Sequence, residues 1–523
     1  MAPHSEGETW GGHHESLELT SRDDAQDANL LTGRVVNRGK YQVSNLLGHV
    51  IPSTLRYTSY RRAPSPSRRR PRFCGRSLAR SCVSLSYITL VIVILYSITG
   101  FIFFPNYSTL PPQYEALREQ ATSSNAPGSG NPKQQKVFIA SNLYDPHGQL
   151  ADGPWADNVL RLIHLLGPDN TYLSIYENDS GDVGSDAMDR LRAKTPCNNT
   201  LVVEDHLDRS GLPKITLVDG RKRVKRITYL AEVRNKALEP LADAETIFDK
   251  VLFLNDVYFD PVEILQLIFA TNDGNYRAAC AVDFINPFKF YDTFASRDLG
   301  GYSMGVPFFP WFSRGGDPRT HDDVIQGKDA VRVRSCWGGM VSFDATFFQP
   351  SDEKIAPITA SEISPANLSA PYRFRAEEDT YWEASECCLI HADIQSPDHE
   401  QSGIFMNPFV RVGYTPRTHA WLGFTKRFEA LYTPVHYLVD IIAGFPHHNA
   451  RREEEPWSEV DEVVWVIDES LEEGGSFQQV TRLASHSAFC GHRALSVMNE
   501  EYSGEVDIDS YEKIPLPSGG LPS

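Results

Sequence analysis

The stretch Phe248-Asp249-Lys250-Val251-Leu252-Phe253-Leu254-Asn255-Asp256-Val257-Tyr258-Phe259 decides the predicted fold of this chain. Its apolar run from Val251 to Leu254 has no polar break, which is typical of a strand buried on both faces of a parallel sheet. The run ends in Asn255 and Asp256, two side chains with oxygen atoms where the strand leaves the sheet. Because open α/β sheets bind ligands beyond the carboxyl ends of their strands, a ligand site is expected here.

Strand-like and helix-like segments alternate on both sides of this stretch. Short connections between such segments predict a doubly wound α/β sheet of the Rossmann type. Later in the chain the pattern is less regular, although two further strands are expected. The expected strands are 136–140, 171–176, 201–203, 250–254, 276–282, 331–343 and 387–392, and the expected helices are 155–166, 186–194, 226–242 and 262–270.

An uncharged apolar segment, residues 83–104, stands apart from this pattern. As a helix its 22 residues would span about 33 Å, enough to cross the hydrocarbon core of a bilayer. Eight arginines lie between residues 61 and 80, so the positive-inside rule places residues 1–82 in the cytosol and the rest in a lumen. The alternative, a buried core helix, does not explain the flanking arginines. A single-pass type II membrane protein is therefore predicted.

Composition divides the chain of 523 residues further. With 41% apolar residues the chain can form a sizeable core, and its net charge of −18 argues against a nucleic-acid partner. The predicted parts are a disordered cytosolic tail (1–82), a transmembrane helix (83–104), a flexible stem (105–135), a globular domain (136–450) and an acidic C-terminal extension that is partly disordered (451–523).

Six of the eight cysteines follow the membrane segment. In an oxidising lumen these six could form up to three disulfides, in any of fifteen pairings. The spacing of a structural zinc site is missing. Sequons at Asn178, Asn198 and Asn367 predict N-glycosylation, whereas Asn106 lies too close to the membrane to be a good acceptor.

Asn255 and Asp256 have the chemistry to hold a divalent cation. A carboxylate at a strand end suits Mn²⁺ or Mg²⁺, which in turn can neutralise a diphosphate. Such sites usually carry two aspartates, but here Asp256 is the one strong ligand, so His391 is a candidate for a further metal or phosphate contact. The structural alternative is that Asp256 caps a turn, or caps the helix that Pro261 opens.

A helix-like segment upstream carries Arg234 and Asn235, two candidate contacts for a nucleotide donor. The planar guanidinium of Arg234 suits phosphate, and the amide of Asn235 suits a base or ribose. The alternative for Arg234 is an exposed helix charge paired with a nearby glutamate. Ser141 and Asn142, which follow the first expected strand, are further candidate donor contacts.

Three more residues are candidates for chemistry at this site. Asp283 is a second acid at the end of an expected strand and could bind the metal or a sugar, although a structural role fits equally well. Glu386 is a candidate carboxylate beside the reacting carbon. Trp337 lies next to two glycines and could stack on a donor or acceptor sugar, but a packed core tryptophan fits as well. Hydrolase and kinase motifs are absent from the sequence.

Several of these motifs, in this order, resemble the fungal capsule-associated mannosyltransferases, the cryptococcal α-1,3-mannosyltransferase family (glycosyltransferase family 69). The resemblance covers about residues 136–415 and leaves out both ends of the chain. The motifs that carry it are Tyr229 to Asn235, Phe248 to Tyr258, Ala278 to Phe284, Ser335 to Met340, Glu386 to Asp393 and Met406 to Val412.

The resemblance implies a type II membrane enzyme of the Golgi or another secretory compartment, with a GT-A-like lumenal domain. Such an enzyme would move mannose from GDP-mannose to a mannoside or other glycan acceptor of the cell wall or capsule, forming an α-1,3 bond with retention. Manganese would be the expected ion. On matching positions, Asp256 would lie at the diphosphate–metal site and Arg234 at the donor.

Two other functions fit the same residues. One is a non-catalytic scaffold or glycan-binding factor for polysaccharide secretion, which would keep the fold without turnover. The other is a transferase that uses a different sugar nucleotide, such as UDP-xylose, through the same metal chemistry.

Overall fold

The computed structural model describes residues 75–104, 106–350, 370–396, 401–468, 470–471, 474–499 and 511–517. These residues belong to two units, one that contains helix α2 (Gly75–Phe103) and a larger one, the head, that begins at Asn106. Of the tail predicted to be disordered, 1–82, residues 1–74 lie outside the described residues, as does the sequon at Asn367. Residues 75–82 belong to helix α2, so the prediction is wrong there.

Helix α2 contains one stretch, Ser84–Phe103, that is long and apolar enough to cross a membrane. Its mean hydropathy is 2.2, and its large side chains are mostly exposed. This matches the predicted span 83–104 in length and composition.

The head is built on a ten-stranded mixed sheet in the order β3-β2-β1-β6-β11-β7-β13-β10-β9, with β8 beside β7. The parallel pairs are β1 with β2 and β6, β2 with β3, and β7 with β13, whereas β11 runs antiparallel between β6 and β7. The strands are β1 (Val137–Leu143), β2 (Thr171–Asn178), β3 (Asn198–Glu204), β6 (Lys250–Leu254), β7 (Ala278–Asn286), β8 (Lys289–Phe290), β9 (Arg297–Asp298), β10 (Val331–Ser335), β11 (Met340–Asp344) and β13 (Ile404–Gly413).

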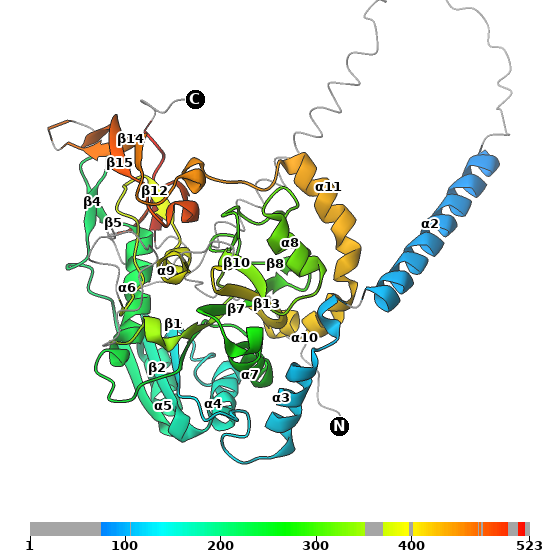
Figure 1. Ribbon diagram of the computed structural model, residues 1–523, viewed down its shortest axis with the longest axis horizontal. Coiled ribbons are helices and arrows are strands. Elements are labelled where there is room, and N and C mark those ends of the chain that lie inside the picture. Colours follow the sequence, from blue (N-terminus) through cyan, green and yellow to red (C-terminus); the bar gives the residue numbers. More distant parts are fainter. Residues whose placement is uncertain are drawn as a thin grey trace, which may run out of the picture. The chain divides into compact units, whose positions relative to one another are not determined.

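Helices cover this sheet (Figure 1). Helix α4 packs against α7, and α6 packs against β1, β2 and α9. The strands and helices expected up to residue 282 are all confirmed, with shifted ends. The helices of the head are α3 (Pro112–Ser123), α4 (Pro154–Leu166), α5 (Gly181–Lys194), α6 (Arg226–Leu238), α7 (Pro261–Phe269), α8 (Pro318–Ile325), α9 (Glu386–Ile394), α10 (Pro416–Thr425) and α11 (Thr433–Ala443).

Two of the later expectations are wrong. Residues 387–392 form helix α9 instead of a strand, because the Ser385 side chain accepts a hydrogen bond from the Cys387 backbone N–H and caps the first turn. All nine residues of α9 are buried, so its sequence lacks the alternation of apolar and polar faces that indicates a surface helix. Residues 331–343 form two strands, β10 and β11, because Gly338 and Gly339 turn the chain at φ values of +58° and +68°.

The expected flexible stem is also wrong, because part of it is folded into the head. Tyr114 of α3 is fully buried, accepts a hydrogen bond from Asn407 Nδ2 at 2.8 Å and donates one to Asp329 Oδ2 at 3.2 Å. Leu117 and Ala121 are buried beside it, at the spacing of one helix face. Because the neighbours of these three buried residues are polar, the sequence pattern did not predict a packed helix here.

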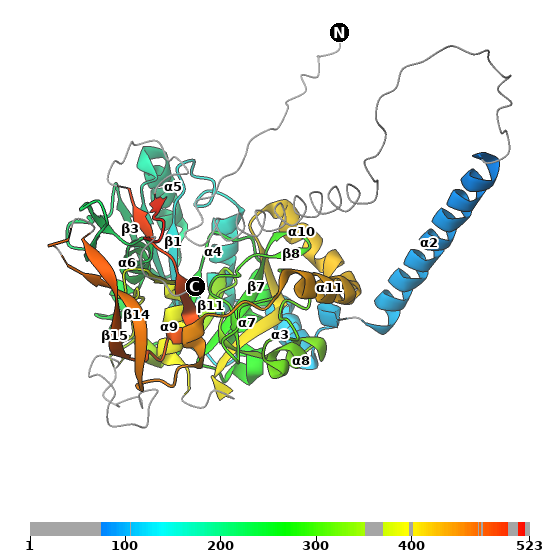
Figure 2. The ribbon, with the colours of Figure 1, turned by 90° about the horizontal axis from the view of Figure 1, so that it is seen from above.

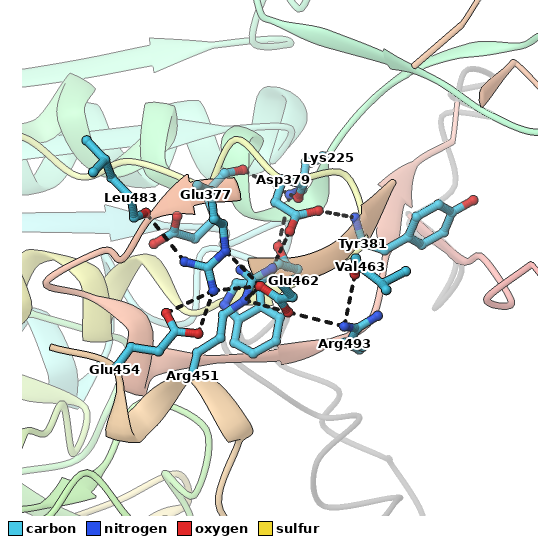
Figure 3. Close-up of polar contacts among 12 residues, drawn as sticks. Lys225, Glu377, Asp379, Tyr381, Arg451, Glu454, Glu462, Val463, Leu483 and Arg493 are labelled. Atoms are coloured by element: carbon cyan, nitrogen blue, oxygen red, sulfur yellow. Dashed lines mark hydrogen bonds and ion pairs between the residues drawn. The ribbon is translucent and has the colours of Figure 1, made fainter. Parts of the chain in front are cut away.

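The expected boundary at residue 450 is wrong as well. The hairpin of β14 (Glu459–Ile467) and β15 (Gly475–Leu483) joins the head through Glu462. Glu462 binds Arg482 within the hairpin, and it binds Arg451 and Arg493 outside the hairpin (Figure 3). Arg451 also binds Asp379, whose carbonyl accepts from the buried Lys225 at the start of α6. The described part of the C-terminal segment therefore supports the central helices.

Two disulfides are formed, Cys280–Cys336 and Cys388–Cys490. Cys197 and Cys387 are buried free thiols. Of the predicted glycosylation sites that the structure describes, Asn198 is exposed, as a glycan requires. Asn178 is only 6% exposed, and its amide donates to Asp179 and to the Tyr229 hydroxyl, so the folded head does not suit a glycan at Asn178.

Candidate active site

The candidate site lies at one edge of the central sheet, where four chain segments meet. Asp256 follows β6, Asp283 lies in the last part of β7, and Tyr414 follows β13. The turn of Gly338 and Gly339 enters the same edge, because Met340 at the start of β11 pairs with Leu254 at the end of β6. A Cβ atom at Gly339 would lie 2.9 Å from Val257 Cγ1 and 3.6 Å from the Tyr414 hydroxyl, so these segments are in close contact.

The Asp256 carboxyl is partly exposed at this edge. Burial raises its pKa from 3.8 to about 6; Arg234 opposes this shift and Asp145 adds to it. The group is ionised above pH 6, but its charge is incompletely compensated by the protein. A carboxylate in this state can gain free energy by binding a cation.

Arg234 interacts electrostatically with Asp256 and is half of a buried ion pair. Its Nε donates to Glu386 Oε1 at 2.9 Å, and both side chains are 1% exposed. The guanidinium carbon lies 4.4 Å from the centroid of the Trp337 ring, and Nη2 has no hydrogen-bond partner among the described residues. Arg234 is therefore neither an exposed helix charge nor an open fork for phosphate, and Glu386 is held by Arg234.

Trp337 and Asn255 form the next contact. Trp337 Nε1 donates to Asn255 Oδ1 at 3.3 Å, and Trp155 Nε1 donates to the Asn255 backbone oxygen at 3.0 Å. Trp337 is only 1% exposed. Of the two interpretations of Trp337, its burial fits the packed core tryptophan, because its ring packs against Phe253, Phe374 and Arg234. Its role is to hold Asn255, and with it the end of β6.

The candidate donor contacts are mostly committed to backbone groups. Ser141 Oγ donates to the Leu254 oxygen at 2.7 Å, and Asn142 Nδ2 donates to the Val233 oxygen at 2.5 Å. The Asn235 amide exchanges two hydrogen bonds with the backbone of Phe374. Ser141 and Asn235 therefore do not fit donor contacts, whereas Asn142 Oδ1 is buried without a partner among the described residues.

His391 is not placed with Asp256. Its Nδ1 lies 2.6 Å from the Cys387 oxygen, and its Nε2 lies 3.8 Å from Cys280 Sγ. Burial lowers the pKa of His391 to about 4, so the ring is neutral. Across the described residues, the one cluster of three potential metal ligands is His391 with Cys280 and Cys336, and those two sulfurs are bonded to each other. The expected metal contact of His391 is therefore wrong.

Asp283 and Asp292 form a buried acidic pair beside the turn of Gly338. Asp283 accepts hydrogen bonds from the Tyr414 hydroxyl at 2.7 Å and from the Asp292 backbone N–H at 3.1 Å. Asp292 accepts from Ser296 and from the Gly338 backbone N–H. Burial, reinforced by the charge of Asp292, raises the pKa of Asp283 to about 7. The pair can therefore retain a proton near neutral pH.

The free energy of unfolding of the head should depend on pH through the proton held by Asp283. Because the pKa of Asp283 is about 7 when folded and 3.8 in its ordinary state, its contribution is full below about pH 4 and lost as the pH rises through 7. We expect Asp283→Asn to unfold at a higher temperature than wild type at pH 8, with a difference that shrinks toward pH 5. Thermal unfolding of both proteins across this range measures it, and a difference independent of pH would contradict the assigned titration.

Two residues at the site were missed from the sequence, Tyr414 and Asp145. Both follow a strand, so the rule that singled out Asp256 could have found them. Asp145 accepts hydrogen bonds from the backbone N–H groups of Gln149, Leu150 and Ala151. This loop holds a second negative charge near Asp256.

Comparison with known proteins shows which family the sequence of the head resembles. The profile of the family described as Cryptococcal mannosyltransferase 1 matches residues 136–393. A curated relative, alpha-1,3-mannosyltransferase CMT1 of Cryptococcus neoformans var. neoformans serotype D, is 24% identical over 283 residues, which are 50% of this chain and 54% of the relative. The chain thus spans about half the length of this relative.

Two solved structures show a weaker similarity. Mannosyltransferase PcManGT from Pyrobaculum calidifontis, in complex with GDP-Man and Mn²⁺, is 12% identical, with 63% of this chain and 80% of that chain covered and a TM-score of 0.31. S. aureus TarS 1–349 is 10% identical, with 53% and 60% covered and a TM-score of 0.27. Such TM-scores do not establish a common fold. The sequence match instead runs from β1 to α9 and includes Arg234, Asp256 and Glu386. Through residues 136–393, this chain belongs to the cryptococcal mannosyltransferase family.

Proposed function

We propose that the head is a metal-dependent mannosyltransferase that moves mannose from GDP-mannose to a mannoside or related glycan, forming an α-1,3 bond. The observation that carries this proposal is the Asp256 carboxylate, partly exposed and incompletely compensated at the end of the central strand. The family description supports mannose as the transferred sugar.

The oxygen atoms at this edge fit a hard divalent cation. Asp256 would hold Mn²⁺ or Mg²⁺, and Asn142 offers an Oδ1 that is unpartnered among the described residues; it lies on the neighbouring strand, one residue after Ser141, which pairs with Leu254. One or two protein carboxylates suffice for such an ion when a diphosphate supplies further ligands. When bound, the cation would neutralise the charge of the leaving diphosphate.

The protein groups around this position would orient the reaction. The Arg234–Glu386 pair fixes α6 against α9 and keeps a positive charge that interacts with Asp256. Tyr414 connects the proton-holding pair Asp283 and Asp292 to the partly exposed edge. In its deprotonated state, Asp283 would receive the proton of the acceptor hydroxyl through Tyr414. Glu386 would reach the reacting carbon only after its release from Arg234.

The membrane location belongs to the same proposal. One apolar helix precedes the head, and the two disulfides suit an oxidising compartment. We infer a single-pass type II protein of the Golgi or a neighbouring secretory compartment, with the head in the lumen.

Transfer assays with the purified full-length protein in detergent test the activity. GDP-mannose with Mn²⁺ and α-mannoside acceptors is expected to give a mannosylated product, and chelation of the metal should abolish it. UDP-xylose and other sugar nucleotides serve as matched donors. Transfer from one of these alone would replace the donor assignment, whereas no transfer from any donor, with an intact fold, would indicate a scaffold.

A further inference from the structure

We propose that the head lies on the lumenal surface of the membrane through an apolar face formed by α10 and α11. We define this apolar face by six exposed side chains. They are Trp421 and Phe424 of α10, which are 49% and 55% exposed, and Val435, Leu438, Ile441 and Ile442 of α11, which are 58% to 63% exposed.

The polarity of α11 is reversed relative to that of an ordinary surface helix. Its side chains that face the head are polar: His436 Nδ1 lies 3.0 Å from Asp440 Oδ2, and both side chains are at most 6% exposed. Asp440 Oδ1 also accepts a hydrogen bond from the Val306 backbone N–H at 2.9 Å. The apolar residues Leu438 and Ile442 point outward instead. Surface helices in water bury their apolar stripe, so this face requires an apolar neighbour.

The charges around the apolar face favour a lipid surface. Between residues 414 and 449 the only acids are Glu429 and Asp440, and both are buried, Glu429 in an ion pair with Arg411. Arg417 and Arg427 in the same segment are exposed. Exposed arginines beside an apolar helix face match a lipid surface, where the basic side chains reach lipid phosphates and the apolar side chains enter the acyl boundary.

The covalent chain brings this face close to the bilayer. The apolar stretch of α2 ends at Phe103, and Tyr107 is already fully buried in the head. Four residues can span at most about 14 Å, so no long stem separates the head from the membrane. Tyr107 belongs to the short 3₁₀ helix Asn106–Ser108, which packs against the 3₁₀ helix Lys426–Tyr432 that joins α10 to α11. The apolar face therefore begins next to Tyr107, at the N-terminal end of the head.

Tryptophan fluorescence of the full-length protein in lipid nanodiscs tests this proposal. Trp421 belongs to the face, whereas tryptophans 155, 311, 337, 382 and 465 are buried in the head. We expect discs with brominated acyl chains to quench part of the emission relative to ordinary discs. Trp421→Phe should remove most of this difference, and Leu438→Glu with Ile442→Glu should reduce it.

A matched variant controls for the added charge. Val183→Glu with Ile247→Glu also replaces two exposed apolar residues of the head, and α5, which carries Val183, lies far from α11 in both views (Figures 1 and 2). This variant should retain the wild-type quenching, and both double variants should unfold at the wild-type temperature. The proposal is overturned if wild type shows no bromine-dependent quenching, or if the Trp421→Phe variant keeps it. If wild type shows no bromine-dependent quenching and forms a dimer, the apolar face would belong to an interface with a second copy instead.

Discussion

Replacing Asp256 with alanine is expected to reduce mannosyl transfer by at least about 100-fold, because the group proposed to hold the cation at the leaving diphosphate is lost. Asp256→Asn should lose a similar amount, since an amide keeps the size of the side chain but not its charge. Both variants are measured as initial rates with GDP-mannose and Mn²⁺ in the full-length protein. Asp189→Asn, a change at an acid of α5 that is 64% exposed, should keep the wild-type rate.

The same change should stabilise the head. The pKa of Asp256 is about 6 in the folded protein and 3.8 in its ordinary state, so its ionised form opposes folding at neutral pH. Asp256→Asn should therefore raise stability by on the order of 1 to 3 kcal/mol at pH 7.5 and by less near pH 4. Lost transfer with raised stability would mark Asp256 as a functional group. Lost transfer with lowered stability would instead favour the turn-capping role.

Replacing Arg234 with methionine is expected to destabilise the head by about 3–5 kcal/mol, because Glu386 would remain buried without its partner. The thermal unfolding midpoint of the detergent-solubilised protein measures this loss. The double variant Arg234→Met with Glu386→Gln should recover a large part of it, since no unpaired buried charge then remains.

The control for this pair is a surface ion pair. Arg190→Met on α5 breaks the contact of Arg190 with Asp152, in which the two side chains are 52% and 31% exposed, and should leave the unfolding midpoint close to that of wild type. If Arg234→Met is as mild as Arg190→Met, Glu386 must have another compensating partner. The buried pair would then not fix α6 against α9.

Much of the sheet could be predicted because its strands carry continuous apolar runs bounded by turns. β6 matches its expected range, and the helices before residue 270 follow a clear apolar period. Helix α9 could not be identified in this way, because all nine of its residues are buried and an apolar run without a period fits a strand as well. Helix α3 was not predicted for the opposite reason: its three buried residues lie among polar neighbours, which gives a weak apolar period.

The candidate site was predictable in position but not in pairing. Strand ends located Asp256 and Asp283 correctly at one edge of the sheet. Long-range partners depend on tertiary contacts that no local pattern encodes, such as Arg234 with Glu386, 152 residues away, or Tyr414 with Asp283, 131 residues away. The same limit explains His391, whose short distance in sequence from Glu386 gave no indication that its ring faces a disulfide.

The bond between Cys388 and Cys490 makes the order of synthesis matter for the centre of the head. Cys388 lies in the first turn of α9, two residues after Glu386, and its partner follows 102 residues later. During synthesis, the disulfide that secures α9 can therefore form only after a late part of the chain has been made. A premature stop codon before residue 490 would leave adjacent free thiols at Cys387 and Cys388. Helix α9, whose Glu386 pairs with Arg234, would then lack its disulfide to the C-terminal segment.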